Sequence, residues 1–296
     1  MRGTFLESES FSANPNVDFC FVGIAYCSAS YLNGVEEASS SIRKLSYRYA
    51  NADGTSSPLK IYSPEEGYVL KNALIADAGT IKARSREELE EALKLISIPE
   101  NVIPIFCGGD HSVTYELVKK VCDDELVLVQ FDAHSDYIDE YDEYPHGSVM
   151  CECKKLKNVK KIIHFGIRGN LNSEPAISKS EKDGNLVVPY YCGINHRFKE
   201  VIEEIKGKKI YITFDTDFLN PSIAPATNCP EPGGPLYDET LSYLKKIIRS
   251  AGKVIGADFV EYNPSCEGSM VTGITLVNII IELLSYIKNK EGEEYP

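Results

Sequence analysis

The sequence predicts an α/β protein of three layers, in which helices cover both faces of a mainly parallel central sheet of about eight strands. Short apolar, β-branched segments alternate along the chain with segments whose apolar residues recur at helical spacing. In strand segments such as 126–131 the apolar residues are continuous, as in strands buried on both faces of a parallel sheet. No linker, composition shift or internal repeat interrupts the 296 residues, so we expect one domain over residues 1–296.

Eight strands are expected in chain order. They are residues 17–25, 74–78, 102–106, 126–131, 161–167, 186–190, 209–214 and 254–260. Helices are expected at residues 34–49, 85–98, 113–121, 195–205 and 238–251. Ser85 and Glu88 form a Ser-x-x-Glu capping pattern, and Asn195 is the expected N-cap of its helix. Residues 271–287 are expected to form a buried C-terminal helix, because Glu282 suits this segment poorly to a membrane.

The composition argues against several classes of function. A formal net charge of −13 disfavours binding to a nucleic-acid backbone, which needs clustered lysine and arginine. The first residues lack the apolar core of a secretory signal, and we expect no membrane span. Nine scattered cysteines without a Cys-x-x-Cys pair indicate mostly reduced thiols in a cytoplasmic protein, although a disulfide stays open.

Polar residues of the kind that bind metals follow four of the expected strands, and the fourth of these clusters is Glu261, after the strand at 254–260. Because the strands of a parallel sheet present their carboxyl ends on one edge, these residues can converge. Asp132, His134 and Asp136 alternate, as do Asp215 and Asp217, so an extended chain would point each set one way. Together with His111 these ligands exceed what one divalent ion needs, which predicts a two-metal site that generates a hydroxide near neutral pH.

At these residues the sequence resembles the ureohydrolase family, which includes arginase, agmatinase and formimidoylglutamase, and its character is closest to agmatinase. The resemblance rests on residues 108–112 (Gly-Gly-Asp-His-Ser), 131–136 (Phe-Asp-Ala-His-Ser-Asp), 214–217 (Phe-Asp-Thr-Asp) and 260–264 (Val-Glu-Tyr-Asn-Pro). It implies an arginase-like fold and two Mn²⁺ ions bridged by a hydroxide, which attacks a guanidinium carbon and releases urea. The metal ligands that it implies are His111, Asp132, His134, Asp136, Asp215 and Asp217.

The resemblance also assigns the other site residues. Glu261 becomes the partner of the guanidinium, and a carboxylate can bind that planar group through two parallel hydrogen bonds. His146 becomes the proton-shuttling histidine, a role that suits an imidazole near neutral pH. Asp136 is counted with the catalytic residues as well as with the ligands, and Asp110 is expected to orient a ligand histidine. His164 is assigned to packing, and the family relationship implies a homo-oligomer, a trimer or hexamer.

The acidic segment after Asp136 favours a cationic guanidino substrate. Residues 137–144 contain four carboxylates and none of the Asn or Ser positions that hold the amino-acid end of arginine in arginase-like enzymes. Such a segment repels an α-carboxylate and attracts a primary ammonium. We therefore expect hydrolysis of agmatine to putrescine and urea, a step of polyamine biosynthesis. Arginine, guanidinobutyrate and guanidine remain alternatives, and formimidoylglutamate is disfavoured. Of two departures from the family, Asn220 is expected to affect only turn capping, whereas residues 226–229 occupy a loop that lies near the substrate in relatives and so bear on the choice.

Two other classes of protein share some of these features. Metal-dependent deacetylases of acetylated amines use a similar scaffold, but Asp215, Asp217 and the segment 261–264 favour guanidinium chemistry. A catalytically silent, polyamine-binding regulator is the alternative from a different class, and the presence of all six ligands argues against it. Mn, Zn, Ni and Co all suit these ligands, so the metal used in the cell stays open.

Overall fold

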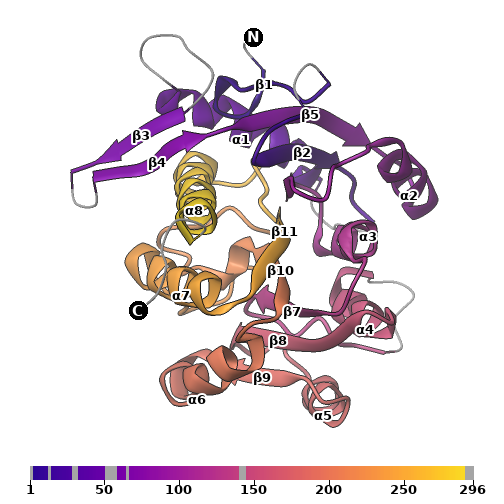
Figure 1. The fold of residues 1–296 in the computed structure, drawn as a ribbon. Coiled ribbons are helices and arrows are strands. Elements are labelled where there is room, and N and C mark those ends of the chain that lie inside the picture. Colours follow the sequence, from indigo (N-terminus) through magenta and orange to yellow (C-terminus); the bar gives the residue numbers. More distant parts are fainter. Residues whose placement is uncertain are drawn as a thin grey trace.

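A computed structural model describes residues 3–12, 15–28, 33–50, 59–64, 67–139 and 145–290, and a nine-stranded sheet forms its middle layer (Figure 1). The strands are β1 (Glu9–Ser10), β2 (Phe19–Ala25), β5 (Ile75–Lys82), β6 (Ile103–Cys107), β7 (Leu126–Phe131), β8 (Val159–Ile167), β9 (Leu186–Pro189), β10 (Lys209–Asp215) and β11 (Lys253–Val260). Their order across the sheet is β1-β5-β2-β6-β11-β10-β7-β8-β9, and neighbouring strands are parallel. The expected fold class is confirmed, with the two-residue β1 as the strand that the sequence did not reveal.

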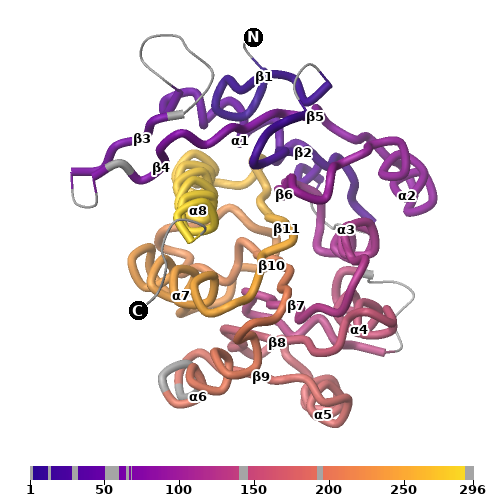
Figure 2. Tube along the Cα trace, in the orientation of Figure 1, coloured from indigo at the N-terminus to yellow at the C-terminus, as the bar shows by residue number. Residues whose placement is uncertain are grey.

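Helices form the outer two layers, as the alternating pattern predicts. They are α1 (Ala38–Ser46), α2 (Arg86–Leu95), α3 (Thr114–Val121), α4 (Val149–Lys155), α5 (Glu174–Lys182), α6 (Tyr190–Ile205), α7 (Tyr237–Ser250) and α8 (Ser269–Lys290). Helices α1, α6, α7 and α8 lie on one face of the sheet, and α2 to α5 lie on the other (Figures 1 and 2). Each layer encloses its own cluster of buried apolar side chains, so the sheet separates two cores.

The continuous apolar segments are strands buried on both faces. Every residue of β6 and of β7 is buried, because helices cover both sides of the sheet there. Helix α8 is apolar for a related reason. Among the described residues it is the helix long and apolar enough to cross a membrane, with a mean hydropathy of 1.8, but 67% of that apolar stretch is buried inside the protein. It packs against α1, α7 and β4 as a core helix.

Several local predictions differ from the structure. Helix α6 begins at Tyr190, directly after Pro189, so the expected N-cap at Asn195 is wrong and that residue lies within the helix. Proline precedes the first turn readily, because its fixed φ suits the start of a helix. A two-stranded antiparallel hairpin, β3 (Leu59–Ser63) and β4 (Gly67–Ala73), also has no counterpart among the expected elements. The capping pattern at Ser85 is confirmed, since its side chain accepts a hydrogen bond from the Glu88 N–H.

A buried ion pair joins α1 to β5. Arg43 Nε and Nη2 donate to the two oxygens of Asp77 at 2.8 and 2.9 Å, and the Asp77 side chain is fully buried. The same carboxylate accepts from the backbone N–H groups of Phe5 and Gly79 at 2.7 and 2.8 Å. This bidentate pair thus fixes the N-terminal segment, the first helix and an outer strand of the sheet relative to one another.

We expect the substitution Asp77→Asn to lower the free energy of unfolding by about 3–5 kcal/mol, because it leaves the buried Arg43 guanidinium without its counter-charge. Urea denaturation followed by circular dichroism measures this change. The matched control is Glu91→Gln, which removes one carboxylate from the exposed pair with Lys94, whose side chains are 74% and 57% exposed. That control should leave the free energy of unfolding almost unchanged. Equal effects of the two substitutions would contradict this account of Asp77.

Candidate metal centre

The register of the sheet brings the polar strand ends together. The four strands that carry them, β6, β11, β10 and β7, are neighbours in the middle of the sheet. Phe131 and Phe214 are register partners, so the residues that follow them, Asp132 and Asp215, leave the sheet side by side. Asp215 in turn pairs with Val260, the residue before Glu261. The expected convergence at one edge of the sheet is therefore confirmed.

Two glycines turn the chain after β6 toward this edge. Gly108 and Gly109 have φ of +103° and +83°, a region that other residues rarely adopt. A Cβ atom on Gly108 would lie 2.6 Å from the carbonyl oxygen of Ile24, so the chain passes too close to β2 for a side chain. The turn leads into a 3₁₀ helix, η4 (His111–Val113), and points the His111 N–H at Glu261 Oε1, at 2.8 Å.

The carboxylates after β7 and β10 converge by turning and not by alternation along an extended chain. Asp132 Oδ1 accepts a hydrogen bond from the His134 N–H at 2.6 Å, and Asp215 Oδ1 accepts one from the Asp217 N–H at 2.9 Å. Aspartate readily caps such a turn two residues ahead. The Ala133 N–H then donates to Asp217 Oδ1 at 3.0 Å and joins the two turns. The spacing of these ligands thus reflects a repeated turn at two strand ends.

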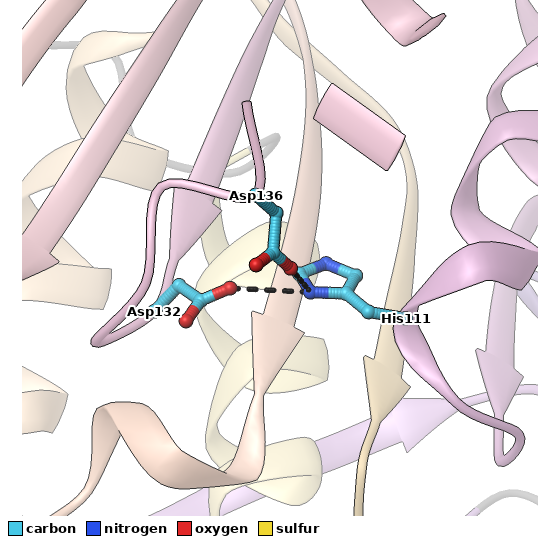
Figure 3. Close-up of side chains that lie close together, drawn as sticks. All are labelled: His111, Asp132 and Asp136. Carbon is cyan, nitrogen blue, oxygen red and sulfur yellow. Dashed lines mark ion pairs between the residues drawn. The ribbon is translucent and has the colours of Figure 1, made fainter. Parts of the chain in front are cut away.

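The side chains form two groups that share Asp132. In the first group, His111 Nδ1 lies 2.9 Å from Asp136 Oδ2 and 3.1 Å from Asp132 Oδ2 (Figure 3), with Asp215 Oδ2 at 3.3 Å. In the second group, His134 Nδ1 lies 2.9 Å from Asp217 Oδ2 and 3.7 Å from Asp132 Oδ1. Each group could hold one metal ion, and Asp132 offers a different oxygen to each. A shared carboxylate is the ligand expected between two adjacent ions.

The electrostatics of this cluster call for a bound cation. Burial and the charges of Asp217 and Asp136 raise the pKa of the Asp132 carboxyl to about 7. Burial alone would lower the pKa of His134, but the charge of Asp217 and the hydrogen bond between them raise it to about 11. The carboxylates therefore retain protons around them when no other cation is present. Divalent ions supply that charge instead and release those protons, so this donor set fits metal ions.

A buried series of hydrogen bonds fixes the tautomer of His111, because it requires the proton on Nε2, the nitrogen that faces away from the carboxylates. Thr213 Oγ1 donates its single proton to Asp258 Oδ1 at 2.6 Å, so it must accept from His111 Nε2 at 2.9 Å. Tyr211 holds the other oxygen of Asp258 at 2.9 Å. His111 Nδ1 has no hydrogen-bond partner of good geometry among the described residues, and it faces acidic oxygens of the ligand carboxylates. Because Nε2 already donates to Thr213, loss of the Nδ1 proton leaves a lone pair that points at those oxygens. A lone pair in that position is suited to a metal ion.

Thr213 and Asp258 take the supporting role that the sequence predicts for Asp110. The carboxylate of Asp110 instead accepts from the N–H and hydroxyl of Ser28, both at 2.7 Å, and caps η4 through Ser112. The expectation that it orients a histidine is wrong. The sequence does contain a pattern that could have identified Thr213 and Asp258, because both are polar residues within otherwise apolar buried strands. Thr213 also precedes Asp215 by two residues and so lies on the same face of β10.

The two groups open into a cavity of about 860 Å³. Its lining includes the metal-binding candidates His134, Asp136, Asp215 and Asp217, together with Glu261 and His146. Burial and the charge of Asp110 raise the pKa of Glu261 to about 8. His146 reaches the cavity from a 3₁₀ helix, η5 (Pro145–Ser148), whereas residues 140–144 of the acidic segment lie outside the described residues. Six of the eight sequence-predicted site residues thus line one cavity, and the other two, His111 and Asp132, lie buried beside it in contact with those ligands.

Comparisons with known proteins agree with this arrangement. The family model described as the arginase family matches residues 17–285 of the chain. The chain is 30% identical over 237 residues to an agmatinase of Halalkalibacterium halodurans, covering 76% of this chain and 80% of that relative. It is 30% identical over 241 residues to an agmatinase of Bacillus subtilis, covering 78% and 81% of the two chains. The fold is similar to that of proclavaminate amidino hydrolase from Streptomyces clavuligerus, with a TM-score of 0.79, 22% identity and coverage of 97% of each chain.

We expect the substitution Thr213→Val to weaken Mn²⁺ binding by about 10- to 100-fold, because His111 loses the acceptor that fixes its tautomer. Equilibrium dialysis with metal analysis measures the affinity. Thr240→Val is the matched control, since Thr240 is equally buried and its hydroxyl bonds only to the Leu236 carbonyl among the described residues. Unchanged Mn²⁺ affinity in the Thr213 variant would show that the tautomer of His111 does not depend on the hydrogen bonds through Thr213 and Asp258.

Proposed function

The chain belongs to the arginase family, and we propose that it is a two-metal hydrolase that converts agmatine and water to putrescine and urea. Members of this family are ureohydrolases, which cleave C–N bonds of amidino groups, and their fold implies a binuclear divalent metal site. We further propose Mn²⁺ as the metal, held by the six residues His111, Asp132, His134, Asp136, Asp215 and Asp217. Bound ions would lower the pKa of a water molecule and supply a nucleophile near neutral pH.

Glu261 is suited to orient the guanidinium. Its carboxylate faces the same cavity as the metal-binding candidates, and its backbone has a φ of +61°, which is uncommon outside glycine. The Glu261 N–H donates to the Gly109 carbonyl at 3.1 Å and the His111 N–H holds one carboxylate oxygen, so the side chain is fixed from two directions. The raised pKa of Glu261 reflects a buried charge that a cationic substrate would compensate.

His146 is the proposed proton donor. Cleavage of the C–N bond leaves the electron pair on the amine nitrogen, which must take a proton to depart as putrescine. His146 lines the cavity from η5, which follows the acidic segment in the sequence, whereas Asp136 precedes that segment. The Ile138 N–H donates to the Gly147 carbonyl at 3.1 Å, which joins η5 to the residues that follow the ligands.

The charge of the cavity lining is the observation that carries the choice of agmatine. The four ligand carboxylates balance the charge of two divalent ions. Beyond them, the described lining contains three carboxylates, Asp110, Asp139 and Glu261, and one lysine, Lys179. Because Asp139 is paired with Lys179, the two negative charges that remain are those of Asp110 and Glu261, and they match agmatine, which carries a guanidinium and a primary ammonium. An α-carboxylate or a guanidino acid would leave that charge uncompensated. The agmatinases among the relatives support the same choice.

A lysine in the cavity lining, Lys179, favours a second candidate substrate, a guanidino acid. Its ammonium lies in the lining, where it could meet a substrate carboxylate, but it is engaged with Asp183 at 2.7 Å and with Asp139 at 3.6 Å. Asp139 is likewise paired, since Lys155 lies 3.6 Å away and Cys151 Sγ donates to it at 3.3 Å. This described carboxylate of the acidic segment is therefore not the unpaired charge that the sequence indicates.

We expect the Mn²⁺-loaded protein to hydrolyse agmatine with a larger kcat/KM than arginine, 4-guanidinobutyrate, guanidine or formimidoylglutamate. A colorimetric urea assay measures the first four reactions, and formamide release measures the last. Faster turnover of arginine or guanidinobutyrate would overturn the choice of agmatine. Comparing Mn²⁺ with Zn²⁺, Ni²⁺ and Co²⁺ at equal occupancy tests the choice of metal.

For Glu261→Gln we expect kcat/KM for agmatine to fall by a factor that corresponds to about 3–5 kcal/mol, the cost of removing one partner from a buried charge pair. The substituted amide oxygen can still accept from the His111 N–H, so Mn²⁺ stoichiometry should stay at the wild-type value. Steady-state kinetics and metal analysis on the same preparation separate the two effects. Loss of bound metal together with activity would assign Glu261 to the metal site and not to the substrate.

A further inference from the structure

A row of buried polar side chains runs from the β8 backbone to the shared carboxylate Asp132. The Ile162 N–H donates to Asn185 Oδ1 at 3.0 Å, and Asn185 Nδ2 lies 3.1 Å from Ser180 Oγ. Ser180 Oγ is 2.7 Å from His164 Nε2. His164 Nδ1 is 2.5 Å from Gln130 Oε1, and Gln130 Nε2 donates to Asp132 Oδ2 at 2.7 Å. Gln130, His164 and Ser180 are fully buried, so these contacts replace water for every group involved.

The direction of donation in this row is fixed from one end. A backbone N–H can only donate, so Asn185 must present its oxygen to Ile162 and its NH₂ to Ser180. Ser180 Oγ accepts that bond and is left to donate its own proton to His164 Nε2. His164 therefore carries its proton on Nδ1 and gives it to the Gln130 oxygen. Burial lowers the pKa of His164 to about 3, which keeps the ring neutral with a single N–H.

The same direction is required from the other end. Asp132 Oδ2 faces His111 and Oδ1 faces His134, and both oxygens act as acceptors. Gln130 meets this need only when its NH₂ points at Asp132, and the same NH₂ also donates to the His134 carbonyl at 3.2 Å. A flipped amide would place its oxygen against a carboxylate oxygen. The N–H of His164 prevents this flip, because it requires the amide oxygen on its own side.

We propose that Gln130 and His164 are positioning residues, which fix the rotation of the Asp132 carboxylate so that its two oxygens serve two metal ions at once. The assignment of His164 to packing alone is thereby replaced. The ring does pack, edge to face against Tyr137 with centroids 5.6 Å apart, but both its nitrogens belong to the row that ends at Asp132. This inference rests on the two-ion centre of the proposed function and not on the choice of substrate.

Titration of the metal-free protein with Mn²⁺, with free Mn²⁺ followed by electron paramagnetic resonance, tests the proposal without any activity measurement. Wild type should bind two equivalents. His164→Phe keeps the aromatic contact but removes the donor, and Gln130→Met removes the N–H at nearly constant shape. We expect each variant to bind the weaker equivalent at least about 10-fold less tightly, the size typical for partners of metal ligands. His164→Asn, which keeps one donor and one acceptor, should recover part of the loss.

Melting temperatures with and without Mn²⁺ distinguish a merely structural role of Gln130 and His164 from a positioning role. The control Ser46→Ala removes an equally buried hydroxyl, which bonds to the Leu6 N–H and the Arg43 carbonyl and has no connection to Asp132. It should lower the melting temperature in EDTA while leaving both Mn²⁺ affinities unchanged. In the His164 and Gln130 variants, the rise in melting temperature on adding Mn²⁺ should shrink, because stabilisation by a ligand follows its affinity.

Three results would overturn the proposal. Wild-type affinity for both equivalents in Gln130→Met would refute it even if His164→Phe fails to fold. Weakened Mn²⁺ binding in Ser46→Ala to the same degree would reduce the effect to general destabilisation. A wild-type protein that binds fewer than two equivalents of Mn²⁺ would overturn the two-ion centre and this inference with it. Binding of two equivalents without release of urea from agmatine would refute only the choice of substrate.

Discussion

The structure is organised around one electrostatic constraint, the burial of several carboxylates at the ends of adjacent strands. Asp132 has no exposed surface, and Asp215 and Asp217 are each 3% exposed. Buried charges of one sign repel strongly and persist only with compensation. The compensation here is partial within the protein, since hydrogen bonds from Gln130 and backbone N–H groups use some of the lone pairs. The rest comes from protons retained on the cluster or from the divalent ions that replace them, so the fold accommodates metal ions as part of its charge balance.

The local backbone supports the same interpretation. Asp136 and Glu261 have φ of +47° and +61°, a region that favours glycine, and both residues line the cavity. Such conformations cost free energy and persist where surrounding contacts hold them. The Met150 N–H donates to the Asp136 carbonyl at 3.0 Å, and the Glu261 N–H donates to Gly109. The main chain at these two positions is therefore fixed before a substrate enters, which limits the reorganisation needed for catalysis.

The sequence predicts the sheet well because buried parallel strands carry a strong pattern of their own. The segment 126–131 coincides with β7, and all eight expected strands correspond to strands of the sheet. What it does not predict is set by tertiary contacts. Residues Glu9 and Ser10 form a strand only because β5 pairs with them, and the start of α6 depends on Pro189. The order of strands across the sheet likewise follows from packing that no local pattern records.

For the site, residue identity is predictable and orientation is not. The six candidate ligands, Glu261 and His146 stand out by type and by their place after strands. Thr213, Asp258 and Gln130 do not, because their roles follow from register partners on neighbouring strands, such as Thr213 with Asp258.

The strand order also has a consequence for how the protein matures. β10 and β11, from the C-terminal third of the chain, lie between β6 and β7, which are synthesised much earlier. The ion-binding edge is therefore absent from a nascent chain until its last strands enter the middle of the sheet, and metal capture reports completed synthesis and long-range assembly.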